Sequence, residues 1–475
     1  MALASFLRES KGERNRPPEP PRIYARDIPE DAKLTFVDFV PSVTHRDKKD
    51  RIFYHPFRIL IEVANKWLQH NYEWEVINCE SVTLLFRHNA CSHVSQWDLM
   101  PNVAASQVMG QEAAIKALRV WIKRRSDIEH KKDKEDIPVL GYRDFAPERK
   151  EGDKIETLDE VVNKINAIIR NGKFDGRIVS VECLPCESSG DLRFDPEATL
   201  PGSSDTFVTI VRIYYESGLS SEEEIGIADF VPVHLSGGSL FSRPEFETFD
   251  NVMSRASRWL SENPEINFRS AMSIDFKLKS MTTLDTRVLT QTDHAGDFVR
   301  IFRIAYTKPF DVSDDVDRSA CLPPLPPIYL YSQMFLLKSR NYTDLKRVIS
   351  DWYTNEIERS DSSNNCANND NSSGNCSSAP GDFASIGEPS TSKSKCQVLS
   401  CETLSVFAKN QTGFEESFNS NRVGARNRCT FIAVRLYYDS GYYIHKERQG
   451  INTVNNNNNS FNNKTDKNSH SCDIM

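Results

Sequence analysis

A set of large apolar residues that recurs four times along the chain is the feature that most limits how it can fold. The clearest copy lies in the segment Pro244–Phe276, which contains Trp259. Trp67, Ile168 and Trp352 occupy the position of Trp259 in the other copies, and the neighbouring apolar positions match without gaps. Recurrence of this kind indicates repeated structural units, so the chain is predicted to contain four of them.

The centre of each unit is predicted to be an amphipathic helix. In the first unit, apolar residues recur at i, i+3, i+4 and i+7 between Leu60 and Leu68, which places them on one helical face. The predicted helices are Phe57–His70, Thr157–Arg170, Phe246–Asn263 and Tyr342–Ile357. Trp67, Trp259 and Trp352 lie on three of them, and we expect these side chains to face a sheet as core residues.

One strand is predicted before each helix and two after it. The first three units open with β-forming residues that end in Asp-Phe-x-Pro, and Ile328–Tyr331 replaces this opening in the fourth. The openings are Leu34–Pro41, Tyr142–Pro147 and Ile225–Pro232. Taken alone, the segment Gln111–Lys123 favours a helix, but the later copies favour a strand at Ile115–Ile122. The other strands are predicted at Trp74–Phe86, Arg177–Leu184, Phe207–Tyr215, Asn267–Leu278, Phe298–Tyr306, Gln397–Ala408 and Thr430–Tyr438.

These elements predict an α+β protein of four tandem β-α-β-β modules, each an antiparallel or mixed three-stranded sheet with one packed helix. The modules are expected at residues 30–125, 138–218, 222–310 and 328–445. The second face of each sheet needs cover, and a neighbouring module can supply it. The order of elements resembles that of small dodecin-like modules, a likeness of fold that implies no function.

Four segments outside the predicted cores have compositions poor in apolar residues. Residues 1–28 form a proline-containing tail, 311–327 an acidic and proline-rich linker, 360–395 a polar insertion in the fourth module, and 446–475 an asparagine-rich tail. Polar segments bury too little apolar surface to offset the entropy of ordering, so the tails and the insertion are expected to be disordered. The run Pro17–Arg22 also fits the pattern of a polyproline ligand for an SH3-type domain.

Charge and composition argue against several classes of protein. The net charge is −8 and no long basic face stands out, which disfavours a nucleic-acid partner. No stretch approaches the roughly 20 apolar residues of a transmembrane helix, and the first residues lack the order of a secretion signal. Eleven cysteines at irregular spacing suit a reducing compartment. We therefore expect a cytoplasmic protein.

An arginine flanked by apolar residues recurs in the last strand of every unit. The four are Arg119, Arg212, Arg303 and Arg435. A charge between apolar residues needs a partner, and the preceding strand offers a glutamate in three units. These are Glu80, Glu182 and Glu402, and Met272 stands in the third unit. Cross-strand ion pairs, Arg212 with Glu182 and Arg435 with Glu402, are therefore predicted. The alternative is a row of anion-binding sites that use the arginine fork.

Aromatic residues follow these arginines in the same strands. Two adjacent tyrosines point to opposite faces of a sheet, so one of each pair leaves its own core. Packing between modules is the expected role, and a binding face is the alternative. The candidate binding residues of this inter-module face are the four arginines together with Tyr215, Tyr306 and Tyr438.

Signals of catalysis, metal binding and cofactor binding are weak. Cys183 and Cys186 have the spacing of a redox pair, but they end a predicted strand, and Cys79 lies near the same place in the first unit, so packing is favoured. Neither an HExxH motif nor a Gly-rich phosphate loop occurs. The acidic run Asp311–Asp317 lacks the central Gly of a calcium loop. We predict no catalytic residue, metal ligand or cofactor.

The last four residues fit a lipidation motif. Cys472 begins a Cys-a-a-X ending whose final residue is Met475, which is the pattern of farnesylation, and it follows a polar tail. One lipid chain is a marginal anchor, so weak and reversible membrane association is expected. Lys464 and Lys467 add little electrostatic help because Asp466 lies between them.

These observations favour a non-enzymatic cytoplasmic repeat protein that acts as an interaction scaffold or adaptor for protein partners. The alternative is a small-ligand-binding or enzymatic protein with a pocket between modules, lined by the last-strand arginines and tyrosines. A closed polar cavity where several of those side chains converge would favour the alternative.

Overall fold

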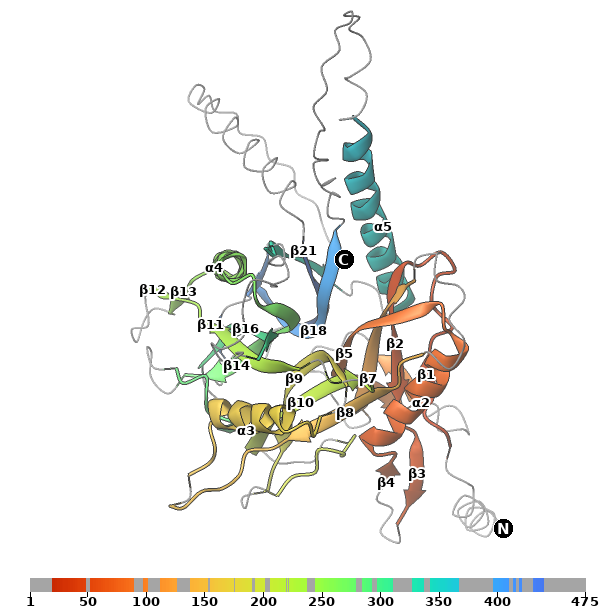
Figure 1. The fold of residues 1–475 in the computed structure, drawn as a ribbon. Coiled ribbons are helices and arrows are strands. Elements are labelled where there is room, and N and C mark those ends of the chain that lie inside the picture. Colours follow the sequence, from red (N-terminus) through yellow and green to blue (C-terminus); the bar gives the residue numbers. More distant parts are fainter. Residues whose placement is uncertain are drawn as a thin grey trace, which may run out of the picture.

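The computed structural model describes residues 19–47, 52–88, 97–100, 112–125, 137–152, 154–174, 176–189, 193–200, 206–218, 220, 222–236, 244–278, 284–292, 297–310, 327–336, 342–366, 396–409, 413–415, 418–420 and 430–439. Within these residues the chain is a mixed α+β protein, mostly strands, with four helices and several small sheets. Figure 1 shows the helices distributed around the strands. Every helix of the described part is too short or too polar to cross a lipid bilayer.

The helices lie where the apolar periodicity predicted them. They are α2 (Phe57–His70), α3 (Leu158–Arg170), α4 (Phe249–Glu262) and α5 (Tyr342–Cys366). The largest difference is at α5, which continues to Cys366 instead of ending at Ile357. Two N-termini are capped by side chains: Thr157 and Glu160 form a capping box at α3, and Thr248 Oγ1 accepts a hydrogen bond from the backbone N–H of Asn251 at α4.

The first two sheets are antiparallel throughout. The first has the order β1–β2–β7–β5–β6, with strands Arg22–Tyr24, Leu34–Val40, Glu112–Arg124, Trp74–His88 and Trp97–Met100. The segment around Ile115 is therefore the strand β7 and not a helix. The second sheet centres on β10 (Thr206–Glu216), which pairs with β8 (Leu140–Phe145), β9 (Arg177–Glu187) and the short β15 (Thr290–Thr292).

The third and fourth sheets have the same kind of centre. In the third, β16 (Asp297–Pro309) pairs with β11 (Glu223–Phe230), β14 (Asn267–Lys277) and β20 (Phe418–Ser420). In the fourth, β21 (Thr430–Asp439) lies between β17 (Leu330–Leu336) and β18 (Gln397–Lys409), and β19 (Gly413–Glu415) pairs with β18. Two hairpins stand apart from these sheets: β3 (Val43–Arg46) with β4 (Ile52–Tyr54), and β12 (His234–Ser236) with β13 (Glu245–Phe246).

Four strands, one from each sheet, contact one another in a closed circuit. β5 lies against β9, β9 against β14, β14 against β18, and β18 against β5. We call these contacts the first seam (β5 with β9), the second seam (β9 with β14), the third seam (β14 with β18) and the fourth seam (β18 with β5). The sheets thus form a ring that closes where the fourth sheet meets the first.

Each helix is covered on two sides by sheets. The core around α2 includes Tyr214 from the second sheet, and the core around α3 includes Ala305 from the third. The core around α4 includes Tyr437 from the fourth sheet, and the core around α5 includes Trp121 from the first. The second face of every sheet is therefore buried against the helix of its neighbour, which explains why strands such as β2 are buried along their whole length.

The helix tryptophans are less buried than expected. Trp67, Trp259 and Trp352 are only partly buried and pack against the edges of the apolar cores. Their rings contact other aromatic side chains, as Trp259 does with Tyr306 at a centroid distance of 5.6 Å. They extend the cores without forming their centres, which leucine, isoleucine, alanine and phenylalanine side chains occupy.

Several predicted segments fall partly or wholly outside the described residues. Strand β1 lies inside the expected tail, since Arg22 pairs with Val40 and the hydroxyl of Ser42 donates to the carbonyl of Pro20 at 2.9 Å. An SH3-type domain would have to compete with this strand pairing for Arg22. Pro17, Pro18, most of the predicted linker and insertion, the asparagine-rich tail and Cys472 lie outside the described residues.

Candidate functional site

The four repeated arginines are buried at the seams. These residues lie on the central strand of each sheet and are at most 1% exposed. Three of them make two-pronged ion pairs with an aspartate on β2, β8 or β11, a neighbouring strand of their own sheet. The pairs are Arg119 with Asp38 (2.7 and 2.8 Å), Arg212 with Asp144 (2.7 and 2.7 Å) and Arg303 with Asp229 (2.6 and 2.7 Å). Charge-assisted forks of this kind fix both the position and the orientation of a guanidinium.

This pairing corrects one of the two predicted ion pairs. The register does place Arg212 directly opposite Glu182 on β9, but it also places Arg212 opposite Asp144 on β8, and the fork binds Asp144. The predicted pair of Arg435 with Glu402 is present at 3.3 Å. The physical reason is the neighbour on the other side: Met334 lies opposite Arg435 where the other sheets have aspartate.

Each arginine also reaches across a seam. Its Nη1 donates to a small polar side chain on the strand of the neighbouring sheet. The acceptors are Thr403 for Arg119 (2.8 Å), Ser81 for Arg212 (3.1 Å), Cys183 for Arg303 (3.3 Å) and Ser273 for Arg435 (3.1 Å). The arginines therefore connect each sheet to the next around the whole ring.

Three glutamates accept hydrogen bonds across the seams. Glu80 and Glu402 are buried, and Glu182 is partly buried. Glu182 accepts the backbone N–H of Ser81 at 3.1 Å, and Glu402 accepts that of Ser273 at 2.6 Å. Glu80 accepts from the Thr403 N–H at 2.8 Å and from the Thr403 hydroxyl at 2.7 Å. Burial raises the pKa of Glu182 to about 7, against the opposing effects of Arg212 and the Ser81 hydrogen bonds.

The aromatic partners of these glutamates are not the tyrosines that were predicted to bind. Trp121 Nε1 donates to Glu80 at 2.8 Å, and the hydroxyl of Tyr437 donates to Glu402 at 2.6 Å. Tyr214 lies beside Glu182 at 3.4 Å. These three residues alternate in phase with the arginines, so they share the arginine face of the strand.

Tyr215, Tyr306 and Tyr438 lie on the opposite face of their strands, against the helix of their own sheet. Tyr215 packs on Phe174, Tyr306 on Trp259, and Tyr438 on Trp352. The structure therefore does not bring them together with the arginines. Successive side chains of a strand point to opposite faces, so the sequence alone indicates that Tyr214 shares the face of Arg212 and that Tyr215 does not.

A polar side chain that follows a β-bulge adds a second bond at each seam. The four residues are Asn78, Ser180, Ser270 and Ser400, each at the register shift of its strand pairing. Ser180 accepts the N–H of Cys79 and donates to its carbonyl, and Asn78 donates to the carbonyl of Cys401 at 2.6 Å. Bulges bend a strand locally, and here the bent strands bring these side chains to the neighbouring backbone.

The second seam differs from the others in three positions. Met272 lies opposite Arg303, where the other sheets have glutamate, and its Sδ accepts the N–H of Cys183 at 3.4 Å. Ala305 takes the place of the seam aromatic residue. Cys183 stands where Ser81, Ser273 and Thr403 stand at the other seams, and burial raises the pKa of its thiol. Cys183 and Cys186 are both buried free thiols.

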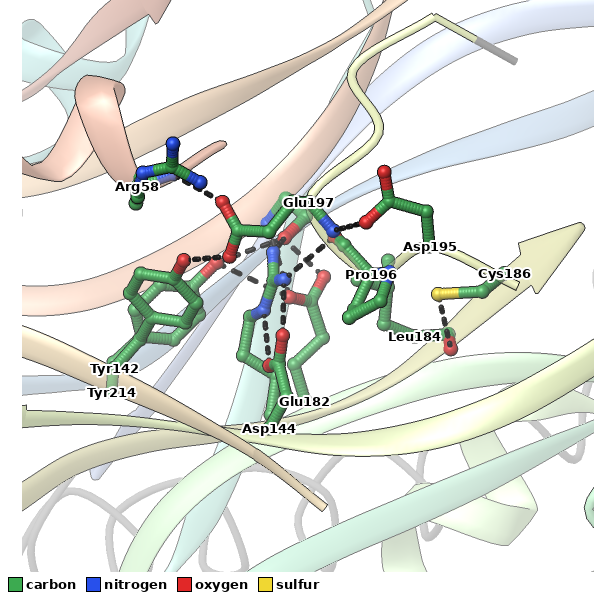
Figure 2. A network of polar contacts seen from close by, with 12 residues as sticks. Arg58, Tyr142, Asp144, Glu182, Leu184, Cys186, Asp195, Pro196, Glu197 and Tyr214 are labelled. Carbon is green, nitrogen blue, oxygen red and sulfur yellow. Dashed lines mark hydrogen bonds and ion pairs between the residues drawn. The ribbon is translucent and has the colours of Figure 1, made fainter. Parts of the chain in front are cut away.

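A short segment before β10 closes the first seam over the start of α2. Figure 2 shows Glu197 between Arg58 and Tyr142, with Asp195 and Pro196 beside it. Glu197 accepts the backbone N–H of Arg58 at 2.8 Å and the hydroxyl of Tyr142. A carboxylate at a helix N-terminus is favourable because the first N–H groups have no partner within the helix. The carbonyl of Pro196 accepts a bond from Arg212 at 3.1 Å.

The corresponding segment at the second seam has the opposite charge. Arg287 pairs with Asp159 in the first turn of α3 at 3.0 Å, and the carbonyl of Thr286 accepts a bond from Arg303 at 2.8 Å. The two seams thus use the same backbone arrangement with exchanged charges. Residues of this segment were not predicted as site residues, because nothing in their local pattern marks them as a contact.

A cavity of about 380 Å³ lies at the second seam. Of the residues predicted to line an inter-module pocket, Arg303 is on its wall, and the other three arginines and the three tyrosines are not. Among the described residues there is no group of three or more His, Cys, Asp or Glu side chains arranged to hold a metal ion. No family model, curated protein or solved structure matches this chain.

Proposed function

We propose that this protein is a non-enzymatic interaction scaffold built from four tandem β-α-β-β modules whose sheets close into a ring. The order of elements supports the modules: β2, α2, β5 and β7 are followed by β8, α3, β9 and β10. The same order returns in β11, α4, β14 and β16, and in β17, α5, β18 and β21. In each set the last strand lies between the other two.

The observation that carries this proposal is how the repeated arginines are used. Each is buried, and each donates both within its own sheet and to the neighbouring sheet. A guanidinium held by a carboxylate fork and a seam hydroxyl has little left to offer an anionic ligand. The most recurrent polar residues therefore build the ring, which favours a scaffold over the row of anion sites.

Exposed apolar side chains on a hairpin are suited to a protein partner. Val233 and Leu235, on and beside β12, are 53% and 58% exposed. Phe53 on β4, in the hairpin before α2, is 39% exposed. Single exposed apolar residues are normal on a protein surface, whereas apolar residues gathered in one place mark contact sites, and Val233 and Leu235 lie two residues apart on one hairpin. We infer that partners dock on the β12–β13 hairpin.

The scaffold proposal is tested by comparing partners that co-purify with variants of the tagged chain. Val233→Ser combined with Leu235→Ser should lose a defined set of partners, whereas Val348→Ser, which changes a residue of equal 53% exposure on α5, should retain them. Each of these partners, once purified, should also bind the purified wild-type chain directly. Turnover of a small molecule by the purified chain, with no partner lost in the hairpin variant, would contradict the scaffold function.

We also propose that the protein is cytoplasmic and carries a farnesyl group on Cys472. The support is the Cys-a-a-X ending alone. Mass spectrometry of the C-terminal peptide from a eukaryotic host should find a farnesylated, trimmed Cys472. An unmodified Cys472 with Asp473, Ile474 and Met475 still attached would rule the lipid out.

A further inference from the structure

The second seam lacks an aromatic ring that the other three seams place beside their arginine. The Arg212 guanidinium lies 4.0 Å from the ring centre of Phe57, and that of Arg435 lies 3.7 Å from Phe249. Arg119 lies 5.3 Å from Tyr342. All three rings belong to the first residue of the helix on the other side of the seam. At the second seam this residue is Leu158, which offers no such ring.

The cavity of about 380 Å³ lies at this seam and is walled mainly by apolar groups. Phe207, Phe276 and Phe298 line it together with Arg303. Among the described residues, the ring in cation–π contact with Arg303 is Phe276, at 5.7 Å. A flat ring in the cavity would meet three phenylalanines and a guanidinium, all of which bind aromatic faces well.

The charged groups on the wall already have partners. Arg303 is held by Asp229 in a two-pronged pair, and Asp275 is held by Arg300 at 2.7 and 2.9 Å. A charged ligand would lose its hydration and find no free counter-charge there, which is costly. A neutral ligand loses much less hydration free energy when it is buried. Thr209 and Gln291 also line the cavity, and their side chains can donate or accept hydrogen bonds.

We propose that the second seam holds a binding site for a neutral small molecule with one or two fused aromatic rings. The volume is within the range of small-molecule pockets, which runs from roughly 300 to 1,000 Å³. The site does not depend on the scaffold function, and it differs from the pocket predicted from the sequence, since Arg303 is the one residue the two have in common.

Cys183 provides a built-in reporter, because it is one of the residues that line the cavity. A molecule in the cavity should protect this thiol from alkylation by N-ethylmaleimide. At a probe concentration ten times its Kd, mass action leaves about a tenth of the sites free, so alkylation should slow about tenfold. The buried thiols of Cys79 and Cys401 lie elsewhere in the ring and serve as internal controls.

The probe is 2-naphthol, and its control is the anion 2-naphthoate. The full-length chain should bind 2-naphthol with protection of Cys183, measured by peptide mass spectrometry, and should bind 2-naphthoate at least tenfold more weakly. Thr209→Phe fills the cavity and should abolish binding. Lys116→Phe is the matched control, since Lys116 N–H donates to Thr199 at the first seam as Thr209 N–H donates to Leu289 at the second, both at 2.7 Å.

Three results would overturn the proposal. They are the absence of 2-naphthol binding to the wild-type chain, equal protection of Cys183 and Cys401, and tighter binding of 2-naphthoate. Thermal unfolding shows whether Thr209→Phe is folded. If it is not, the wild-type protection pattern and the comparison of the neutral with the anionic probe still decide the question.

Discussion

The first and second seams join equivalent strands with different chemistry. At the first seam Glu182 accepts the N–H of Ser81, and Arg212 lies over the ring of Phe57. At the second seam Met272 stands in place of the glutamate, and Leu158 begins the helix in place of the aromatic residue. A buried charge that lacks a hydrogen-bond partner costs much free energy, whereas a gap between apolar or sulfur-containing side chains costs less. The cavity of about 380 Å³ lies at this second seam.

The first and second seams share one contact and differ in several others. The arginine fork on the aspartate of the first strand is present at both seams, with almost the same distances. The glutamate, its aromatic donor and the charge of the closing segment all differ. The fork is therefore common to these two seams, as it is to Arg119 and Asp38, whereas Arg435 pairs with Glu402 instead.

Removing the aspartate of the fork should have the largest effect, and a similar effect at both seams. Asp144→Ala leaves Arg212 buried without its partner, so we expect a loss of about 3–5 kcal/mol in the free energy of unfolding. Asp229→Ala should cost about as much at the second seam. The double variant Asp144→Leu with Arg212→Met should recover most of the loss. Denaturant unfolding measures all three, and a loss below about 1 kcal/mol for both single variants would show that the forks are dispensable.

Stability should depend on pH through the first seam and not through the second. The pKa of Glu182 is about 7 in the folded state, mainly because of burial, and about 4.3 in an unfolded chain. The folded state therefore binds more protons between these values, so the contribution of Glu182 is fully present below about pH 4.3 and is lost as the pH rises to 7. We expect a fall of up to about 3 kcal/mol in wild type relative to Glu182→Gln.

The measurement is a series of denaturant unfolding curves across this pH range. Glu80 also has a raised pKa because of burial, so it contributes a slope of the same sign in both proteins and cancels in the difference. Met272→Leu, at the equivalent position of the second seam, should show the wild-type slope. A wild-type curve parallel to that of Glu182→Gln would mean that Glu182 keeps an ordinary pKa.

The smallest effect is expected from exchanging the charges of the closing segments. Glu197→Arg removes the acceptor at the start of α2 and sets a cation there beside Arg58, which should cost about 1 kcal/mol. Adding Arg58→Asp recreates the pair that Arg287 and Asp159 form at the second seam, and should recover a few tenths of a kcal/mol. Thermal unfolding at low salt compares the three proteins. Equal stability of wild type and Glu197→Arg would show that the segment charge does not matter.

Much of the local structure could be predicted because it depends on short-range patterns. The apolar period placed α2 at Phe57–His70, and the later copies correctly indicated a strand at Ile115 despite its helical composition. Periodicity also placed Trp67 on the sheet side of its helix, but it overstated the burial, because a large ring at the edge of a core is only partly covered. The four-module organisation remains our proposal.

The site was harder to predict because its partners lie far apart in the chain. Arg212 was expected to pair with Glu182, and the register does set them opposite each other. A central strand has two neighbours, however, and no local pattern says which carboxylate takes the guanidinium. Glu182 instead accepts a hydrogen bond across the first seam from Ser81, which lies more than a hundred residues earlier in the chain. Arg212 therefore binds Asp144.

The amino-acid sequence by itself determined which segments are helices and strands, which residues alternate toward each face, and that an arginine would be buried in every last strand. Those properties follow from periods of 3.6 and 2 residues and from the cost of an unpaired charge. The tertiary structure alone decided that β18 returns to β5 to close the ring, that Tyr214 and not Tyr215 lies at a seam, and that a cavity lies at the second seam. These depend on contacts between distant segments, whose geometry no local pattern specifies.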